Sequence, residues 1–476
     1  MKNKLRMIVF ILVTLFICSA CSKEEKPVDS EENATVTQTP TLTLMQNEVI
    51  SPTAKPNKSE LDIEAIDEIN SSIGETKPTI SITPAVTEEI EEIEEIEENE
   101  EIEDIELSPT PIMDTQLNHT EESKIFDNNS KAYIDDLGTV AGIRVFGDKI
   151  TITDIIEIKS DILVIPSTID KKPVVAIGNG ALELVEVSKV VISNGITRIE
   201  AQAFYGNTNI KQISIPESVA DIGMNALGNC SKLEKIELSS KNANYCLVNG
   251  VLYNKEKTSI IRYPAARKDE TCFIEEGVVS IEAGAFSMSK NLAYVFFPKS
   301  LRSIGTEAFA GCILLDVDIP EKLIELEAFA FANCYSMRKI VIPKGIEEIA
   351  EGTFSGCEKA TSITFLGTVK EIGYSAFSNC SLVNKVEFKS SASFIGEMAF
   401  AFCTSLKSIT LPSGTQEIAD MAFYSCYNLE QIMIPDTVSF FGSMIFDQIS
   451  NVVIKTPKGS KAVEYAQLNG IACIKQ

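Results

Sequence analysis

Seven cysteines occupy one repeated slot in the last two-thirds of the chain, and thiol groups can bind metals or form disulfides. They are Cys230, Cys312, Cys334, Cys357, Cys380, Cys403 and Cys426. From Cys312 onward they are 22 or 23 residues apart, and none belongs to a Cys-x-x-Cys motif. Other copies of the slot hold Val185, Asn207, Ser289 and Ile449, so cysteine is replaceable there. We therefore expect buried thiols that pack as small apolar side chains, with disulfides between neighbours or a metal site as the alternatives.

Other residues able to perform acid–base or nucleophilic chemistry are scarce in the repeated part of the chain. The only histidine is His119, which precedes the repeats, so they contain no imidazole for a Ser–His or Cys–His pair. Carboxylate pairs such as Glu325/Glu327 and Glu347/Glu348 could in principle serve a glycosidase, but charges at such turns are usually solvated. No glycine-rich phosphate loop is found. The sequence predicts no catalytic residue, no metal and no cofactor, and therefore a protein that is not an enzyme.

The cysteines belong to a longer phrase that occurs eleven times, for example IGTEAFAGC (Ile304–Cys312) and IGEMAFAFC (Ile395–Cys403). Successive copies of its alanine slot, from Ala181 to Ile445, are 23 residues apart seven times, 22 twice and 59 once. A fixed period of this length is typical of a solenoid, in which each repeat forms one coil. We predict a β-rich solenoid of about eleven coils of about 23 residues.

A second element recurs between the phrases, as in Ile409–Leu411 and Ile340–Ile342. Its alternating apolar residues predict a short strand whose first and third side chains point inward. Proline often follows and ends the strand, as Pro343 and Pro412 do. Each coil should then contain a strand, a turn, a short extended piece and a compact turn that carries phenylalanine and cysteine.

Three stretches depart from the period. Residues 131–176 predict a strand-rich N-terminal cap, and residues 239–273 predict a hairpin insertion, because Asn249-Gly250 is a strong type I′ turn signal. Residues 450–476 predict a C-terminal cap with a helix whose N-cap is Ser460. Caps of this kind cover the exposed ends of a solenoid.

The repeat resembles that of the BspA-like leucine-rich repeat family of bacterial surface proteins. The residues that carry the resemblance follow the pattern I-x-x-x-A-F-x-x-C-x-x-L-x-x-I-x-I-P, as in the stretch beginning at Ile395, and extend over residues 131–476. The resemblance implies a curved, β-rich solenoid at a cell surface with a role in adhesion or protein recognition. It supplies neither a catalytic residue nor a defined ligand.

The N-terminal quarter is acidic and polar. Residues 22–130 hold 29 acidic and 6 basic side chains and predict a disordered tether rich in Thr, Pro and Glu. Residues 1–21 predict an export signal, with a basic start and an apolar core at Met7–Ile17. The run Cys18-Ser19-Ala20-Cys21 resembles the lipobox of bacterial lipoproteins, which implies cleavage before Cys21 and lipidation of that residue. An ordinary secretory signal cut nearby is the alternative.

The outward residues of the predicted strands are the candidate binding surface. Tyr294 and Phe296 stand out as two aromatic residues on one strand, with Asp318 and Val341 on the strands that follow. Packing of the two aromatic rings against the hairpin insertion is the alternative interpretation.

These features predict an exported protein, lipid-anchored to the outer face of a bacterial membrane, whose solenoid binds an extracellular or surface protein. A module that binds cell-wall or extracellular polysaccharide is the alternative. Residues 131–476 are nearly balanced in charge, with 39 acidic and 33 basic residues, which argues against a nucleic-acid partner.

Overall fold

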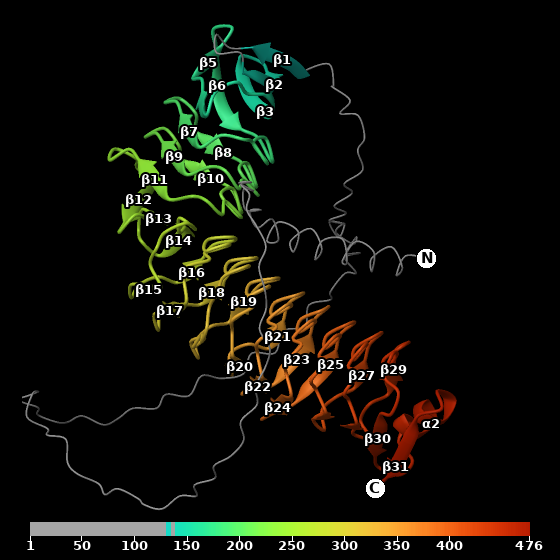
Figure 1. Cartoon of the computed structure of the whole chain (residues 1–476). Coiled ribbons are helices and arrows are strands. Elements are labelled where there is room, and N and C mark those ends of the chain that lie inside the picture. The colour runs from blue at the N-terminus through green and yellow to red at the C-terminus, as the bar shows by residue number, and fades with distance from the viewer. Residues whose placement is uncertain (1–129, 135–138) are drawn as a thin grey trace, which may run out of the picture. The chain divides into compact units, whose positions relative to one another are not determined.

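The computed structural model describes residues 130–134 and 139–476, which all belong to the unit Thr115–Gln476. The expected signal peptide, Cys21 and residues 22–129 of the expected tether lie outside the described residues. Along the described chain, strands and turns recur with the period of the sequence, and successive coils follow one another in chain order (Figure 1). The prediction of a β-rich solenoid is confirmed, with about 14 turns in place of the expected eleven or so.

All but one of the repeated coils contribute a strand to what we call the long-strand ladder; the coil that carries Asp316 joins it through a single bridge to Tyr294. Paired strands in the ladder are parallel and one coil apart, so that Lys339, Ser362 and Lys385 lie side by side. Its strands are β4 (Ile162–Ile165), β7 (Lys189–Ile192), β9 (Gln212–Ile215), β11 (Lys235–Leu238), β15 (Thr271–Phe273), β17 (Tyr294–Phe296), β20 (Lys339–Ile342), β22 (Ser362–Phe365), β24 (Lys385–Phe388), β26 (Ser408–Thr410), β28 (Gln431–Met433) and β30 (Val453–Thr456). Buried and more exposed residues alternate along these strands, as in β17 and β20, because successive side chains point to opposite faces.

A second column, the short-strand ladder, precedes the compact turns. Its strands are β6 (Lys172–Ile177), β8 (Arg198–Ile199), β10 (Asp221–Ile222), β14 (Ser259–Arg262), β16 (Ser280–Ile281), β18 (Ser303–Ile304), β19 (Glu325–Leu326), β21 (Glu348–Ile349), β23 (Val369–Ile372), β25 (Ala392–Ile395), β27 (Glu417–Ile418) and β29 (Phe440–Phe441). The compact turns that follow also bond from coil to coil: the Phe309 N–H donates to the Ala330 carbonyl at 2.8 Å.

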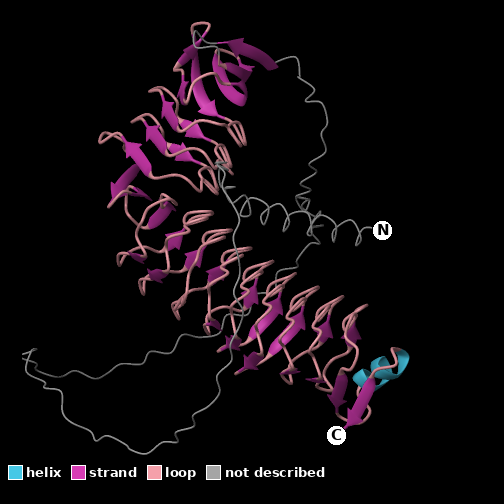
Figure 2. Cartoon of the chain, viewed as in Figure 1, coloured by secondary structure: helices cyan, strands magenta, loops and turns pink. Residues whose placement is uncertain are grey.

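Both ends of the solenoid depart from the repeat. At the N-terminal end, β1 (Ser130–Ile134), β2 (Val140–Phe146) and β3 (Lys149–Glu157) form an antiparallel meander, which joins β6 in parallel. The short β5 (Thr168–Ile169) pairs with β6 as well. At the other end, β30 is followed by α2 (Lys461–Leu468) and then by β31 (Ala472–Lys475), which pairs with β30 in parallel (Figure 2).

The predicted capping role of Ser460 is correct in position and wrong in contact. Ser460 is the N-cap residue of α2, yet its hydroxyl makes no hydrogen bond to the helix backbone. Its oxygen lies 2.7 Å from the Thr456 hydroxyl oxygen instead. The Ser460 hydroxyl therefore interacts with the last residue of β30 and not with the helix backbone.

The interior consists of side-chain columns that run from coil to coil. Phenylalanine rings stack on one another from Phe286 to Phe446, with centroids 4.8 Å apart at Phe286–Phe309 and 5.9 Å apart at Phe423–Phe446. These rings are buried and pack with the inward residues of both ladders. The prediction that the phenylalanines form a core spine is confirmed.

The hairpin insertion forms as predicted but also supplies a coil that the sequence analysis missed. β12 (Tyr245–Val248) and β13 (Val251–Asn254) are antiparallel, and the turn residues Asn249 and Gly250 have φ of 49° and 79°, as a type I′ turn requires. β13 then pairs with β14, which joins the short-strand ladder through β16. Tyr263 follows β14 and stacks on Phe286, with centroids 5.1 Å apart. The long step in the period thus contains one additional coil, in which Tyr263 occupies the phenylalanine slot.

Candidate functional site

The repeated cysteines lie inside the solenoid as the sequence predicted. All seven are buried, and every cysteine in the described part of the chain is a free thiol. Each of the seven donates its S–H to the carbonyl of the phenylalanine one coil earlier, for example Cys312 to Phe286 at 3.1 Å and Cys380 to Phe354 at 3.3 Å. The column therefore combines apolar packing with one weak hydrogen bond per coil.

Two substitutions at this slot show what it requires. Asn207 occupies the slot in an early coil and donates from its amide to the carbonyls of Leu182 and Phe204, at 2.6 and 2.8 Å. Ser289 occupies the slot in the coil after the insertion, and its buried hydroxyl has no partner in the described residues. The preceding coil there is the irregular one that contains Tyr263. A side-chain donor at this slot therefore finds a backbone carbonyl as its acceptor where the preceding coil has the regular shape.

Burial makes these thiols poor nucleophiles. Desolvation raises the pKa of Cys312, Cys380 and Cys426 to about 12 and that of Cys230 to about 11. Desolvation also raises the pKa of Cys334, Cys357 and Cys403 well above its usual range. Since the thiolate is the reactive form, the column is a structural feature.

The outward side chains predicted to bind a ligand lie on the long-strand ladder. On β17, Tyr294 and Phe296 are 38% and 52% exposed, while Val295 between them is buried. Asp318 is exposed in the next coil, and Val341 is half-buried on β20.

The four predicted residues lie on three consecutive coils. Tyr294 forms a parallel bridge with Asp316, so β17 is adjacent to the coil that carries Asp318. Arg338, directly before β20, forms an ion pair with Asp316 and so links this coil to the next. The four residues therefore belong to one continuous stretch of the ladder.

The structure adds Phe273 to the aromatic residues of this surface. Phe273 ends β15, is paired in register with Phe296, and stacks on its ring with centroids 4.7 Å apart. It is 72% exposed. We call Phe273, Tyr294 and Phe296 the aromatic patch.

Sequence reasoning overlooked Phe273 because it assigned that residue to the insertion. The signal was present: Phe273 precedes Phe296 by 23 residues, which is one period. Phe273 lies on β15, so its stacking on Phe296 is a contact between strands of the ladder. The described residues leave both rings of the stacked pair exposed.

Within residues 139–476, no group of three or more His, Cys, Asp or Glu side chains is placed to bind a metal ion. In the described part of the chain, no helix has the length and apolar character needed to cross a bilayer.

Parallel ladders joined by one compact turn per coil define a solenoid of the leucine-rich-repeat type. A family model for the BspA type leucine-rich repeat region matches residues 175–264, 265–383 and 324–453. These matches cover more than half of the chain, so it belongs to the BspA type leucine-rich repeat family. The resemblance stated from the sequence is confirmed, and the family suggests a binding scaffold on an exported or surface protein.

Several solved structures are similar to this chain, whereas no curated protein that was compared matches it. A leucine-rich cell surface protein from Faecalibacterium prausnitzii is 24% identical with a TM-score of 0.44, over 72% of this chain and 97% of that one. A leucine-rich repeat protein from Eubacterium ventriosum is 23% identical with a TM-score of 0.47, over 67% and 95%. A leucine-rich repeat protein from Bacteroides ovatus is 22% identical with a TM-score of 0.36, over 74% and 100%.

Proposed function

We propose that this protein is a lipid-anchored, surface-displayed scaffold that binds an extracellular or surface protein through its long-strand ladder. The aromatic patch is the observation that carries the proposal. Elsewhere on this face the outward positions hold mostly polar or small aliphatic residues, for example Ser214, Thr364 and Thr410. Exposed aromatic rings that lie together are typical anchors of protein interfaces.

The surroundings of the patch support a protein partner. Asp316 and Asp318 lie in the next coil, and Arg338 pairs with Asp316 at the surface. An apolar centre beside exposed charges is the usual arrangement of a protein interface. The proposed role is binding without catalysis, since the repeated residues are buried in the core of the scaffold.

Replacing both Tyr294 and Phe296 with serine is expected to abolish partner binding and leave the melting temperature nearly unchanged. Both side chains are outward, so their loss removes contact area without opening a cavity in the core. Binding of the purified protein to a panel of matrix and surface proteins, and to a panel of glycans, is the measurement.

The matched control is the pair Lys189→Ser and Val191→Ser, which changes the corresponding outward positions of β7. It should retain binding. A large loss of stability in the Tyr294/Phe296 variant would assign these rings to the core instead. Binding to the glycan panel alone would show that the ligand is a polysaccharide and not a protein.

The anchor is the second part of the proposal and rests on Cys21 in its lipobox-like run. Cells that express the protein are expected to incorporate labelled palmitate into it, and Cys21→Ala should remove the label, because the thiol that carries the lipid is gone. Cys18→Ala is the matched control and should keep the label. Label that persists in Cys21→Ala would defeat the assignment.

A further inference from the structure

The short-strand ladder carries a column of outward side chains, one per coil, directly before the buried residue that ends each strand. In the later coils these side chains are paired in the strand register, about 4.8 Å from one coil to the next. We call them the acidic–aromatic stripe, which consists of Glu348, Glu371, Phe394, Glu417 and Phe440.

The same column is balanced or neutral in earlier coils. Arg198 lies opposite Asp221, and Ser280 lies opposite Ser303. In the stripe, by contrast, the first two carboxylates lie directly opposite each other. Like charges in such positions destabilise a sheet, so a cation beside the stripe would relieve a repulsion that the chain itself contains.

The stripe is accessible to a partner. Glu348 and Glu371 are exposed, Phe440 is 52% exposed, and Phe394 and Glu417 are half-buried. Within the described residues, the carboxylates of Glu371 and Glu417 neither accept a hydrogen bond nor form an ion pair. These two carboxylates lie on either side of the Phe394 ring in the register.

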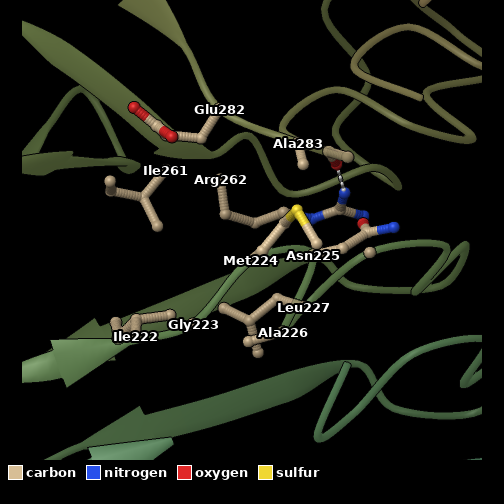
Figure 3. A pocket seen from close by; sticks show the side chains of 12 residues that line it. Ile222, Gly223, Met224, Asn225, Ala226, Leu227, Ile261, Arg262, Glu282 and Ala283 are labelled. Carbon is tan, nitrogen blue, oxygen red and sulfur yellow. Dashed lines mark hydrogen bonds between the residues drawn. The ribbon is translucent and has the colours of Figure 1, made fainter. Parts of the chain in front are cut away.

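Basic side chains of the same ladder bind other groups. Lys370 on β23 forms an ion pair with Glu347 at 2.6 Å. Arg262 ends β14 in the additional coil, whose compact turn is two residues shorter than the next, and it turns inward there (Figure 3). It is 1% exposed, and its Nη1 donates to the Ser287 hydroxyl at 2.9 Å. These cations leave the two carboxylates beside Phe394 unpaired.

We propose that the acidic–aromatic stripe binds an arginine-bearing segment of a partner protein, at a surface separate from the aromatic patch. Each unpaired carboxylate has a ring next to it, with Phe394 between Glu371 and Glu417 and Phe440 after Glu417. A guanidinium suits this arrangement because it donates to a carboxylate while its flat face stacks on a neighbouring ring. An ammonium group has no such face, so arginine is favoured over lysine.

The charge of the stripe also excludes other occupants. Residues 22–130 of the same chain hold 29 acidic and 6 basic side chains, so the carboxylates of the stripe repel this segment. Nucleic acids and acidic polysaccharides are repelled for the same reason. An external segment that carries positive charge is therefore the complementary occupant.

The test uses a tryptophan introduced into the stripe, because the chain contains none and the signal then arises at this site alone. The full chain with Phe440→Trp is titrated with hexa-arginine, with hexalysine, and with hexacitrulline, which keeps the flat side-chain group without the charge. We expect a saturable fluorescence change with hexa-arginine, a weaker one with hexalysine and none with hexacitrulline. Phe146→Trp is the matched control: this ring is 58% exposed and lies opposite Lys149, so it should not respond.

A carboxylate variant separates binding from folding. In the Phe440→Trp chain, Glu371→Gln together with Glu417→Gln should raise the hexa-arginine concentration at half-signal by roughly threefold to tenfold, because two exposed ion pairs are lost. The melting temperature should not fall, since the change relieves a repulsion between like charges. Glu234→Gln with Glu256→Gln changes the net charge equally at exposed positions outside the stripe and should leave the half-signal concentration unchanged.

Three results would overturn the proposal. One is an unchanged half-signal concentration in the Glu371→Gln, Glu417→Gln variant. Another is the absence of any response to hexa-arginine in both Phe440→Trp and a second reporter, Phe394→Trp. The third is a signal that changes on dilution without peptide, which would assign the stripe to a contact with a second copy of the chain.

Discussion

Replacing Phe354 with alanine is expected to lower the free energy of unfolding by about 3–5 kcal/mol, the range measured for large aromatic side chains removed from cores. Phe354 is 1% exposed and stacks on Phe331 and Phe377, each with a centroid distance of 5.5 Å. The substitution removes a ring from the middle of a continuous stack, so a cavity opens between Phe331 and Phe377. The coils that carry these two residues cannot close the cavity without breaking their parallel strand pairs.

The measurement is chemical denaturation together with hydrogen exchange resolved along the chain. Because the ring of Phe354 stacks on the rings of the two adjacent coils, the loss of protection should be largest in the coils that carry Phe331, Phe354 and Phe377. Phe296→Ala is the matched control: it removes the same side chain from an outward position and should change stability by less than about 1 kcal/mol. Equal losses in the two variants would contradict the assignment of inward and outward faces.

Raising the pH from 8 to 10 is expected to destabilise the folded chain strongly. The pKa of each thiol in the cysteine column is raised by burial, to about 12 for Cys312 and Cys380. In the unfolded chain a thiol ionises near pH 8.5–9. Above that pH the unfolded state loses protons that the folded state keeps, so stability is fully present below the unfolded pKa and falls as pH rises.

The effect is large because it is repeated in every coil that has a cysteine at this slot. Each thiol contributes on the order of 1 kcal/mol between pH 8 and pH 10, and the contributions of the seven buried thiols act in the same direction. Tyr263, whose pKa burial also raises, acts in the same direction.

Denaturation midpoints at the two pH values, under reducing conditions, test this expectation. Cys380→Ala is the diagnostic variant. Its loss of stability between pH 8 and pH 10 should be smaller than that of the parent protein by on the order of 1 kcal/mol, the contribution of one thiol. An identical pH dependence in the variant would show that Cys380 is not protected from ionisation in the folded state.

Where the chain repeats, the sequence was sufficient to predict the fold. Residues such as Ile304, Phe309 and Cys312 recur at one spacing, so each residue type marks a column of side chains that point into the core. The turn at Asn249-Gly250 was predictable for a local reason, since few other residue pairs accept positive φ at both positions.

The features that the sequence analysis did not predict lie mainly in the irregular coil. Arg262 and Tyr263 fill slots that alanine and phenylalanine hold elsewhere, and their coil is two residues short, so neither residue type nor spacing identified it. Phe273 was hidden by the same irregularity. The hydroxyl of Ser460 could accept from the helix backbone but lies beside the Thr456 hydroxyl instead, and this choice depends on where the end of β30 places Thr456.

The shortened coil has a consequence for how the solenoid unfolds. The buried core is divided there: one apolar cluster extends from Ile143 to Leu252 and the other from Val251 to Ala466. The backbone contacts that join other coils are partly replaced at this boundary by side chains, among them Arg262 and the Ser287 hydroxyl, which accepts from the Asn229 N–H at 2.8 Å. We therefore expect the described chain to unfold as two cooperative units in series, with its weakest joint at the insertion that interrupts the repeat.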